Sequence, residues 1–523
     1  MNKIVAKLKL HNFRRFREFS VDFNDEMNLL IGDNESGKSS ILQALDLVMS
    51  GSRSKVDTLS LESLMNIDII SEYLAGTKAL EDLPVMWAEV YLNEQNNPDL
   101  NGKNHSEGID CRDGLKLLCE PMDEYGNEIA DILKEAEPNF PFEYYSIKFK
   151  TFSGESYTGY RRFMKHLLLD GSQINNEYAT REYVKKMYRA NVDDREKNKH
   201  QNEYRKHKSQ FWNNVLSHLN DRLNSYKFSV ATNTKSNLET DLMITEDDIS
   251  IENKGKGRQC FIKTEFALQR SSTGNPLNVL LLEEPENHLS HTNMKKLVSM
   301  IAGAVDKQLI VATHNSLICT RLDLRKAIML NSSGDKPATL DGVPKDTAGF
   351  FVKAPDNNIL EFILSKKVIL VEGDAEYILM EALYEKVAGN ELYSADVHVI
   401  SVGGTSFKRY LDLAKLLNIK TAVIRDNDGN YQKNCVENYK DYSLDDIKVF
   451  FESDNKLKTF EICMYEKNKA VCDDQFTTGH IKLPPQDYML NNKAEAALRL
   501  LENKSAELIA PEYIRNAIKW ISG

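Results

Sequence analysis

The chain lacks the features that define several large classes of protein. Its 523 residues have a mean hydropathy of −0.47 and contain no run of about 18 apolar residues, the length that crosses a bilayer. The N-terminal segment MNKIVAKLKLHNFRRF alternates apolar and basic side chains and has no apolar signal-peptide core. The seven cysteines include no Cys-x-x-Cys pair, which argues against a disulfide framework or a structural zinc site. Secreted and membrane-spanning classes are excluded, and we expect a cytoplasmic protein with no membrane partner.

An excess of positive charge is also missing. The chain has 67 Lys and Arg against 78 Asp and Glu, a net charge of −11. This balance excludes a surface that is basic all over, although a local groove for nucleic acid is still compatible with it. Hydrophobic residues make up 41% and charged residues 28%, as in ordinary globular proteins. The length predicts two to four folded units, and we find no internal repeat or low-complexity tract.

A phosphate-binding loop stands near the start of the chain. The segment 32–39, GDNESGKS, fits G-x-x-x-x-G-K-[ST], with a predicted strand at 27–31 before it and a predicted helix from Ser39 after it. A chance glycine-rich turn is the alternative, which this strand–loop–helix context disfavours. Lys38 is expected to reach the β- and γ-phosphates of ATP, and Ser39 to bind Mg²⁺. The residues expected to bind the nucleotide are Gly32, Asn34, Gly37, Lys38, Ser39 and Ser40.

Two acids far downstream complete this site in the prediction. Residues 277–284, LNVLLLEE, form an apolar strand that ends in Glu283 and Glu284. Glu283 is expected to hold Mg²⁺ through water, slightly displaced because aspartate is more usual there, and Glu284 to activate the attacking water. His314 follows the next strand, Gln308–Ala312, and is expected to sense the γ-phosphate. The alternative for His314 is a purely structural role.

The pattern changes in the last third of the chain. Apolar strands at 367–371, 396–402 and 421–425 alternate with helices at 374–388 and 406–418. Alternation of this kind predicts a parallel α/β sheet covered by helices. We place the domain boundary near residue 355, which gives domains at 1–355 and 356–523.

Four carboxylates are expected at the carboxyl edge of this second sheet. Glu372 ends a strand, Glu376 lies in the next helix, and Asp426 and Asp428 follow a later strand with i, i+2 spacing that would aim them at one site. No basic partner is evident, so divalent cations are expected to neutralise them. Two Mg²⁺ or Mn²⁺ ions roughly 3.5–4 Å apart could then hydrolyse a phosphodiester. An Asx turn is the alternative for Asp426-x-Asp428 alone.

The middle of the chain is less informative. Residues 181–223 have a helical, very polar pattern that we interpret either as a solvated arm or as a strip following a phosphate backbone. Tyr188 and Tyr204 are interleaved with its basic residues, which are Lys185, Lys186, Arg189, Arg195, Lys197, Lys199, Arg205, Lys206 and Lys208.

The first half of the chain resembles the ABC-type ATPase heads of the SMC and RecF group. The resemblance rests on Asn12-Phe13-Arg14, the phosphate loop, the segment 283–289 (EEPENHL) and Ala312–Ser316 (ATHNS). It implies that ATP lies between two heads, in a homodimer or larger assembly, with residues of about 100–250 inserted as a partly helical arm or dimerisation region. The candidate for the signature loop that caps ATP is Lys254–Gln259, for which a flexible basic turn is the alternative.

The second half resembles a Toprim domain in Glu372-Gly373, the turn Val402–Ser406 and Asp426-x-Asp428. A head followed by Toprim is similar to the OLD (overcoming lysogenization defect) nucleases. This resemblance implies two further catalytic residues: Glu461, in the strand-like segment 459–462, and Lys493, which opens a helix. Glu495 is another candidate, although an exposed helical glutamate is its simpler interpretation.

The resemblance as a whole implies an ATP-binding, metal-dependent DNA endonuclease whose nucleotide state regulates cleavage. It also implies a role in defence against phage, with a partner such as a helicase or a reverse transcriptase and its DNA. The main alternative is an ATP-driven DNA-binding or repair protein of the SMC/RecF kind, in which the Toprim half is a non-catalytic scaffold. A primase or topoisomerase is a weaker alternative. A primase would usually have a zinc module, which the cysteines do not offer, and a topoisomerase needs a nucleophilic tyrosine, which the sequence does not single out among 22 tyrosines.

Overall fold

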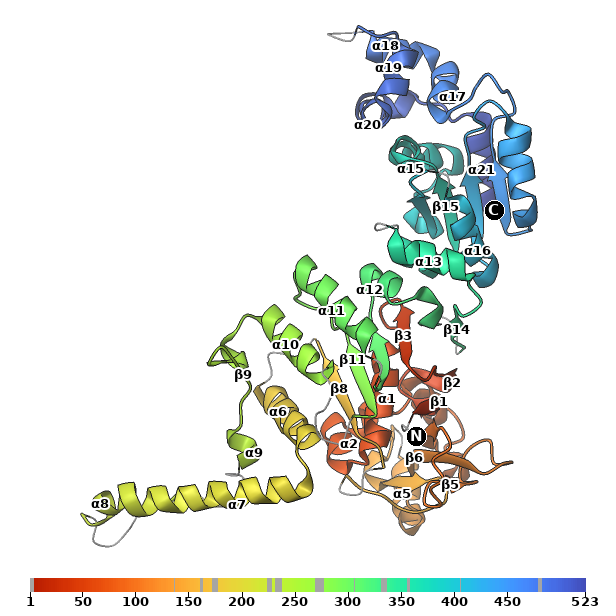
Figure 1. Cartoon of the computed structure of the whole chain (residues 1–523). Coiled ribbons are helices and arrows are strands. Elements are labelled where there is room, and N and C mark those ends of the chain that lie inside the picture. Colours follow the sequence, from red (N-terminus) through yellow and green to blue (C-terminus); the bar gives the residue numbers. More distant parts are fainter. Residues whose placement is uncertain are drawn as a thin grey trace. The chain divides into compact units, whose positions relative to one another are not determined.

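In the computed structural model the chain folds into two compact units (Figure 1). The N-terminal unit comprises residues 1–314 and 326–337, and the C-terminal unit comprises 315–325 and 338–523. The domain boundary near residue 355 stays a prediction. The described residues are 4–135, 137–159, 163–171, 177–222, 228–230, 238–268, 277–304, 306–330, 336–354, 358–404, 406–477 and 482–523.

Two large sheets form the core of the N-terminal unit. An antiparallel sheet runs in the order β2-β1-β4-β6, and β6 also pairs with β5 and β7. Its strands are β1 (Val5–Phe13), β2 (Phe16–Asp22), β4 (Met86–Leu92), β5 (Asn101–Gly102), β6 (Arg112–Pro121) and β7 (Tyr145–Thr151). A parallel sheet runs in the order β13-β3-β12-β11-β8. Its strands are β3 (Met27–Gly32), β8 (His166–Asp170), β11 (Val279–Glu283), β12 (Gln308–Ala312) and β13 (Ala327–Leu330).

Helix α1 (Lys38–Ser50) joins the two sheets. It follows β3, contacts β4 and β6 of the antiparallel sheet, and also contacts β8, β11 and β12 of the parallel sheet. Almost every residue of α1 is buried, because apolar side chains such as Ile41, Leu45 and Val48 point into the core on both sides. The strands predicted near residues 3–10 and 27–31, and the helix predicted from Ser39, are confirmed within three residues.

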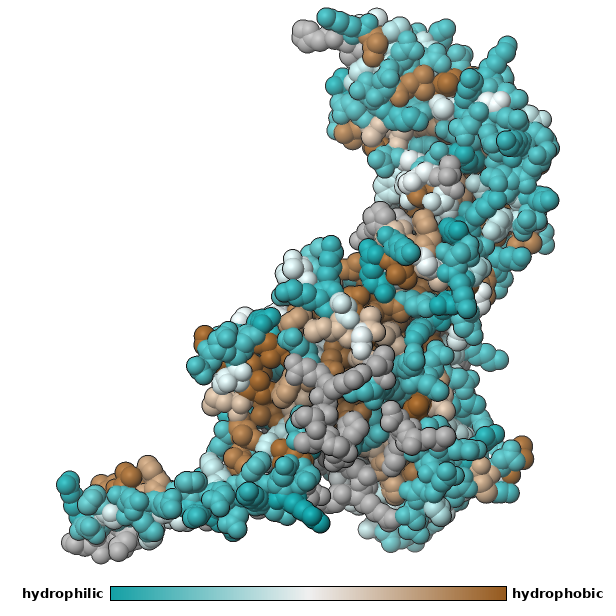
Figure 2. Space-filling model, in the orientation of Figure 1, coloured by the Kyte–Doolittle hydropathy of each residue, from teal (hydrophilic) through white to brown (hydrophobic). Residues whose placement is uncertain are grey.

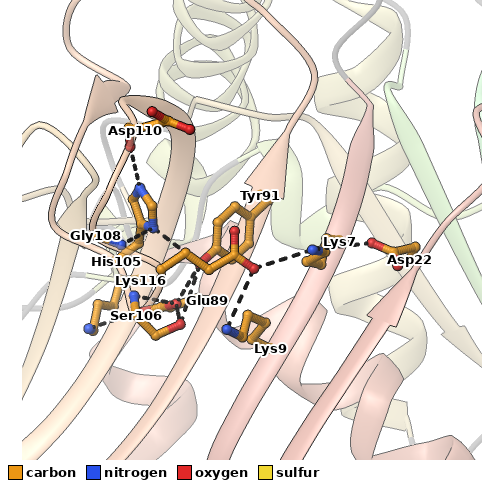
Figure 3. A network of polar contacts seen from close by, with 11 residues as sticks. Lys7, Lys9, Asp22, Glu89, Tyr91, His105, Ser106, Gly108, Asp110 and Lys116 are labelled. Atoms are coloured by element: carbon orange, nitrogen blue, oxygen red, sulfur yellow. Dashed lines mark hydrogen bonds and ion pairs between the residues drawn. The ribbon is translucent and has the colours of Figure 1, made fainter. Parts of the chain in front are cut away.

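A polar network fixes a long loop to one face of the antiparallel sheet (Figure 3). The side chain of Glu89 on β4 is fully buried and accepts hydrogen bonds from Lys116 Nζ (2.9 Å), Ser106 Oγ (2.8 Å) and Tyr91 Oη (3.0 Å). Next to it, His105 Nε2 lies 3.0 Å from the Asp110 carbonyl oxygen. A buried carboxylate needs such partners, so the network is a structural anchor for the loop before β6.

The polar segment 181–223 is helical, as expected, within its described residues. It contains the end of α6 (Glu177–Asn191), α7 (Asp194–Phe211) and α8 (Ser217–Asn220). Asp193 and Glu196 form a capping box at the start of α7. The acids of α9 (Leu238–Asp241) neutralise part of the basic strip: Lys197 lies 3.3 Å from Glu239 and Lys208 lies 3.5 Å from Asp241. Some of the basic residues of this segment therefore form ion pairs within the unit.

Apolar side chains are exposed at the C-terminal end of the same helical segment, after α7. Figure 2 draws hydrophobic surface there, and the residues exposed after α7 include Trp212, Val215 and Leu219. The backbone locally widens to a π-helix over Trp212–Leu216.

The C-terminal unit holds a parallel sheet in the order β16-β15-β17-β18. Helices of this unit, including α15, α20 and α21, share one apolar core with its strands. The strands are β15 (Lys367–Val371), β16 (Val397–Ser401), β17 (Lys420–Ile424) and β18 (Ile447–Phe450). The helices are α12 (Ser316–Arg321), α13 (Lys345–Lys353), α14 (Ile359–Leu364), α15 (Asp374–Ala388), α16 (Phe407–Leu417), α17 (Phe460–Lys467), α18 (Lys469–Phe476), α19 (Pro485–Asn491), α20 (Lys493–Lys504) and α21 (Glu512–Ser522).

The parallel α/β pattern predicted for residues 367–425 is confirmed, with ends that differ by one residue or less. The prediction for one element, a strand at 459–462, is wrong. The segment 459–462 is not a strand, because α17 begins at Phe460 and carries Glu461 in its first turn. Among the described residues, no helix is both long and apolar enough to cross a membrane.

Candidate functional site

The phosphate loop connects β3 to α1 and depends on two glycines. Gly37 has φ +98°, a conformation that other residues rarely adopt, and a Cβ there would overlap the ring of Phe16. A Cβ at Gly32 would overlap the carbonyl oxygen of Leu330 on the neighbouring strand. The loop therefore requires glycine at both positions, for reasons of space as well as backbone conformation. This is the turn that lets backbone N–H groups face a phosphate.

A cleft of about 430 Å³ opens over this loop. Lys38 is buried, and its Nζ donates to the carbonyl oxygens of Gly32 (2.6 Å) and Asp33 (2.9 Å). The ammonium group is therefore held at the loop, at the start of α1, where the helix dipole favours an anion. Of the residues expected to bind nucleotide, those that line the cleft are Asn34, Gly37, Lys38, Ser39 and Ser40.

Arg14 and Arg15 also line this cleft, and we did not predict either as a site residue. They lie in the turn between β1 and β2, and Arg15 Nη1 donates to the carbonyl oxygen of Glu35 in the loop. Burial lowers the pKa of Arg14, and the charge of Glu283 partly offsets this effect. The sequence contained a signal, because Arg14 belongs to the Asn12-Phe13-Arg14 motif. Two guanidinium groups beside a phosphate loop can bind an anion.

Glu283 ends β11 at the same edge of the sheet as the loop. It lies in register with Ala312 of β12 and with Asp170 of β8. Burial raises the pKa of Glu283 and the nearby charges of Asp170 and Glu284 add to this, while a hydrogen bond from Ser39 opposes it. The structure thus brings Glu283 together with Ser39, the two side chains expected to hold Mg²⁺.

Glu284 and His314 lie together at the ends of β11 and β12. His314 Nδ1 is 3.4 Å from Glu284 Oε1, and Asn287 Nδ2 donates to the other oxygen at 2.8 Å. Glu284 has φ +44°, and its backbone N–H bonds to the carbonyl oxygen of Ala312. Glu284 also lines the phosphate cleft. The side chain expected to activate water is therefore at the cleft, and the histidine expected to sense phosphate is its neighbour.

Glu286 is a further residue that we did not predict. It is buried, and its Oε1 accepts hydrogen bonds from Thr313 Oγ1 (2.5 Å) and the His314 N–H (3.3 Å). Burial raises its pKa. By holding the segment after β12, Glu286 fixes the backbone that carries His314. Glu286 and Thr313 both belong to motifs visible in the sequence, but their contact follows only from the fold.

The candidate signature segment Lys254–Gln259 is not a free turn. Helix α10 (Lys256–Leu268) begins within it, and Lys254 and Arg258 both pair with Glu246. The Gln259 side chain donates to the Lys254 carbonyl oxygen at 2.8 Å. Part of the segment is therefore helical and its basic side chains are paired, whereas a role in capping ATP stays a prediction.

Acidic side chains gather at the carboxyl edge of the second sheet, as expected. Glu372 follows β15, Glu376 is buried in the first turn of α15, and Asp426 follows β17. Burial, and then repulsion from Glu461 and Glu372, raises the pKa of Glu376 to about 7. Burial and the charges of Glu376, Glu372 and Glu461 raise the pKa of Asp426 to about 8. Repulsion of this kind acts between carboxylates that lie near one another.

Asp428 is placed differently from the prediction. Strand β17 ends at Ile424, and Asp428 has φ +49°, so the i, i+2 rule for extended chains does not apply. Asp428 is exposed and accepts a hydrogen bond from Arg425 Nη2 at 2.8 Å. The other terminal nitrogen of Arg425 pairs with Glu372. The expectation that the acids have no basic partner is therefore wrong.

Glu461 and Lys493 meet at this edge, as the resemblance implied. Lys493 Nζ, at the start of α20, is 3.0 Å from Glu461 Oε1. Glu461 is buried, and its Oε2 has no hydrogen-bond partner among the described residues. Glu495 pairs with Arg499 on the exposed side of α20, in agreement with its simpler interpretation. The turn Val402–Ser406 is described except for Thr405, which lies outside the described residues.

Asn427 holds the loop that carries the two aspartates, and we did not predict it. The side chain is buried, and its Nδ2 donates to the carbonyl oxygens of Glu452 (2.8 Å), Asp454 (3.1 Å) and Leu457 (3.1 Å). A single amide thus fastens the loop after β17 to the loop after β18. Its position between two acids was visible in the sequence, but its partners were not.

The oxygen atoms of the carboxylates at this edge are chemically suited to bind a hard divalent cation. All the candidates are carboxylates, and the buried, unpartnered oxygen of Glu461 is the kind of atom that an ion satisfies. Within the part of the chain that the structure describes, however, no three His, Cys, Asp or Glu side chains are grouped so that they could hold one ion together. Arg425 and Lys493 stand among the carboxylates in this arrangement.

Comparisons with known proteins agree with both halves of the chain. Residues 4–319, more than half of the chain, match the family model described as an AAA ATPase domain. Residues 363–428 match the model described as overcoming lysogenization defect protein-like, TOPRIM domain.

Individual relatives match shorter stretches. The Old nuclease of Escherichia phage P2 is 20% identical over 31% of this chain and 30% of its own length. A DNA replication and repair protein RecF from Oenococcus oeni is 44% identical over 10% of this chain and 14% of its own length. These alignments span less than a third of each relative.

A solved structure of an SMC head, bound to the C-winged helix domain of ScpA, is 15% identical with a TM-score of 0.35, covering 62% of this chain and 93% of that one. The parallel sheet of the N-terminal unit carries the phosphate loop within the matched AAA ATPase domain, and three strands of the parallel sheet of the C-terminal unit lie within the matched TOPRIM domain. Through residues 4–319 the chain belongs to the family of AAA ATPase domains, and its residues 363–428 are similar to the TOPRIM domain of overcoming lysogenization defect proteins.

Proposed function

We propose that this protein is an ATP-binding DNA endonuclease that requires a divalent cation, Mg²⁺ or Mn²⁺. The observation that carries the proposal is the acidic edge of the C-terminal unit, where Glu372, Glu376 and Asp426 repel one another and Glu461 is buried beside Lys493. Carboxylates that raise each other's pKa destabilise a fold unless a cation neutralises them. The presence of such a cluster at the carboxyl edge of a parallel sheet favours a functional role over a structural one.

The residues divide into two groups by what they can do. Glu376, Asp426 and Glu461 would have to draw together from the arrangement seen here to hold the cation, which when bound would polarise a phosphodiester and lower the pKa of a water molecule. Lys493, which is about half exposed, can contact a non-bridging phosphate oxygen and stabilise the charge that develops there. Asn427 keeps Asp426 in position by fixing its loop. Together they orient a DNA strand and its scissile phosphate.

The nucleotide is proposed to control this reaction. Lys38, Ser39 and Arg14 around the cleft would bind ATP with Mg²⁺, while Glu284 beside His314 would activate water if the nucleotide is hydrolysed. Regulation requires that ATP favour one arrangement of the units over another. Nicking of plasmid DNA that is indifferent to ATP, ADP and Lys38→Ala alike would remove this part of the proposal.

The nuclease proposal is tested by cleavage of supercoiled plasmid with Mg²⁺ or Mn²⁺. We expect the wild type to nick or cut the plasmid, and both EDTA and Asp426→Asn to stop it. Glu495→Gln is the matched control, because it removes a carboxylate from the exposed side of α20. Cleavage that persists in Asp426→Asn at the wild-type rate would assign the activity to another site or a contaminant.

A second candidate function is a DNA-binding or repair protein of the SMC and RecF kind, in which the Toprim unit is a scaffold. The pairing of Arg425 with Glu372 and Asp428 favours it, because an arginine can neutralise acids without a metal. A direct binding measurement separates the candidates. A scaffold binds DNA with ATP but takes up no Mn²⁺ at this edge, and a nuclease takes up Mn²⁺ that Asp426→Asn abolishes.

The resemblance also supplies a setting for the reaction. We propose a cytoplasmic effector of defence against phage that acts as a homodimer or larger assembly through its ATPase heads. A helicase, or a reverse transcriptase with its DNA, is the kind of partner that this setting implies. Sedimentation with and without ATP, compared between wild type and Lys38→Ala, tests the assembly. A monomer under every condition would contradict it.

A further inference from the structure

A pair of aromatic rings lies at the acidic edge and takes no part in the chemistry proposed above. The rings of Tyr431 and Phe451 are stacked, with their centroids 5.6 Å apart and their planes at 15° to each other. Tyr431 belongs to the loop after β17, which also carries Asp426, and Phe451 directly follows β18. Because β17 and β18 are parallel neighbours, both loops leave the sheet at its carboxyl edge. Both rings are only partly buried, so they form part of the surface at the edge that carries the acids.

Hydrogen bonds between the two loops hold this pair in position. The Tyr431 N–H donates to Asn455 Oδ1 at 3.0 Å. The Asn427 side chain adds its three bonds to carbonyl oxygens of the loop after β18. A π-helix, Gln432–Val436, begins immediately after Tyr431, and such turns are frequent at functional sites. The loops are thus joined by polar contacts that do not depend on the rings, so the role of the rings can be tested by substitution.

Exposed lysines flank the aromatic pair. Lys433 lies in the π-helix, and Lys456 and Lys458 lie in the loop after β18. Lys458 reaches the other loop, where a Cβ built at Gly429 would lie 3.6 Å from its Cε. Among the described residues, no carboxylate oxygen lies within 4.0 Å of any of these three ammonium groups. Proteins bind single strands of nucleic acid with this combination, in which bases stack on the rings and phosphates contact the cations.

We propose that Tyr431 and Phe451 form a stacking platform for an unpaired base of DNA at the acidic edge of the Toprim unit. Phosphates of the same strand would contact the three exposed lysines beside the rings. A base inside a duplex is covered on both faces by its neighbours, so a side chain can stack only on a base that is unpaired or at an end. The inference rests on the proposed nuclease function, to which it adds the form of DNA that the site accepts: single-stranded or locally opened.

The first test measures the affinity of the full chain for a single-stranded oligonucleotide and for the duplex of the same sequence, by fluorescence anisotropy in EDTA. Tyr431→Leu keeps an apolar side chain against Phe451 but removes the ring, and it should weaken single-strand binding about tenfold. Duplex binding should change less than about twofold. Tyr393→Leu is the matched control, because Tyr393 is exposed before β16, at the opposite edge of the same sheet. Equal losses for the two forms of DNA, or equal effects of the two substitutions, would overturn the inference.

A second measurement decides the question even if Tyr431→Leu does not fold. A single-stranded oligonucleotide that carries 5-iodouracil is irradiated with the wild-type chain, because this base cross-links efficiently to an aromatic side chain stacked on it. Mass spectrometry should find the cross-link in the peptides that contain Tyr431 or Phe451. Lys458→Ala, at an exposed position, should lower the yield at least about threefold, whereas Lys366→Ala, exposed at the opposite edge, should leave it unchanged. Cross-links only to other parts of the chain would overturn the inference.

Failure of the inference can be distinguished from failure of the proposed function, because neither measurement needs a metal ion or cleavage. Unaltered single-strand affinity of Tyr431→Leu, together with plasmid cleavage by the wild type, would overturn the stacking platform and leave the nuclease intact. A selective loss of single-strand affinity, on a protein whose wild type never cleaves DNA, would support the platform as a DNA-binding site and contradict the nuclease.

Discussion

The two sites of this protein are built from different parts of the chain. Backbone groups dominate the phosphate loop, where Gly32 and Gly37 leave space that no other residue would leave and Lys38 bonds to loop carbonyls. Side chains alone make the acidic edge of the Toprim unit, and their charges are balanced by Arg425 and Lys493. A site made of backbone depends on conformation, whereas a site made of charges depends on which side chains are neighbours. The substitutions that follow test this contrast and the charges around it, in order of decreasing effect.

Removal of Lys38 should give the largest effect. Lys38→Ala takes away a buried ammonium at the start of α1, and loss of such a charged hydrogen-bonding partner costs about 2–5 kcal/mol of binding free energy. We expect ATP affinity, measured by calorimetry with Mg²⁺, to fall at least about 30-fold. Mn²⁺ binding by the Toprim unit should be unchanged. A parallel loss of Mn²⁺ would mean that the two sites are not built independently.

Asp46 tests a buried charge outside both sites. It lies on α1, pairs with Lys55, and has an oxygen 3.0 Å from His166 Nε2. Removal of one partner from a buried charged group costs about 3 kcal/mol, so Asp46→Asn should lower the free energy of unfolding in urea by that amount. Asp57→Asn is the matched control, since Asp57 is exposed on α2 (Arg53–Leu59). Equal stability of the two variants would contradict the prediction.

The same cluster predicts sensitivity to acid. Burial would raise the pKa of Asp46, but Lys55 and His166 lower it well below its ordinary value, so its contribution to stability is lost as the pH falls below about 4. Burial also lowers the pKa of His166, so the folded state favours the neutral ring and loses stability below about 6.5. His166→Gln should therefore flatten the decline in unfolding free energy between pH 7 and 5. An unchanged slope would contradict this assignment.

Gly37 tests the dependence on conformation with a smaller effect. Gly37→Ala forces a side chain into a left-handed position against Phe16 and should lower the free energy of unfolding by about 2 kcal/mol. Gly303→Ala is the control at the end of α11 (His291–Gly303), where a Cβ meets nothing within 4 Å. It should raise the free energy of unfolding by about 0.5 kcal/mol. Urea denaturation measures both, and changes of the same sign would contradict the prediction.

Glu495 should give the smallest effect. Its carboxylate pairs with Arg499 on the same exposed helix face, so Glu495→Gln should change Mn²⁺ affinity and plasmid cleavage by less than about twofold. Glu461→Gln removes a buried carboxylate from the same edge and should weaken Mn²⁺ binding about tenfold or more. If the two substitutions had equal effects, the assignment of Glu461 to the cation would be wrong.

The sequence predicted the helices and strands of the molecule better than the contacts between side chains. Lys367–Val371 is an apolar run bounded by polar residues, and Asp374–Ala388 ends before a glycine, so both elements were predicted with the right limits. Glu461 was assigned to a strand because the segment 459–462 alternates like one, whereas the observed helix packs Phe460 into the core of the unit. Short alternating segments do not distinguish the two structures without their tertiary contacts.

The charge pairing at the acidic edge could not be predicted in the same way. Arg425 is adjacent to Asp426 in the sequence, yet its partners Glu372 and Asp428 are determined by the order of the strands and by one left-handed residue. Likewise, nothing local to Asn427 indicates that it bonds to three carbonyls of another loop. Residue types at a site can be predicted from a motif, but their ion pairs follow from the fold.

The position of α1 has a thermodynamic consequence for the whole ATPase unit. The helix begins at Lys38 in the phosphate loop, and its body lies in the core shared by both sheets. A nucleotide that binds only the folded loop stabilises the fold by mass action. Because α1 cannot unfold without exposing the apolar faces of both sheets, that stabilisation extends to the two layers together. In the presence of the nucleotide, the heat resistance of this unit therefore rises with its affinity for ATP.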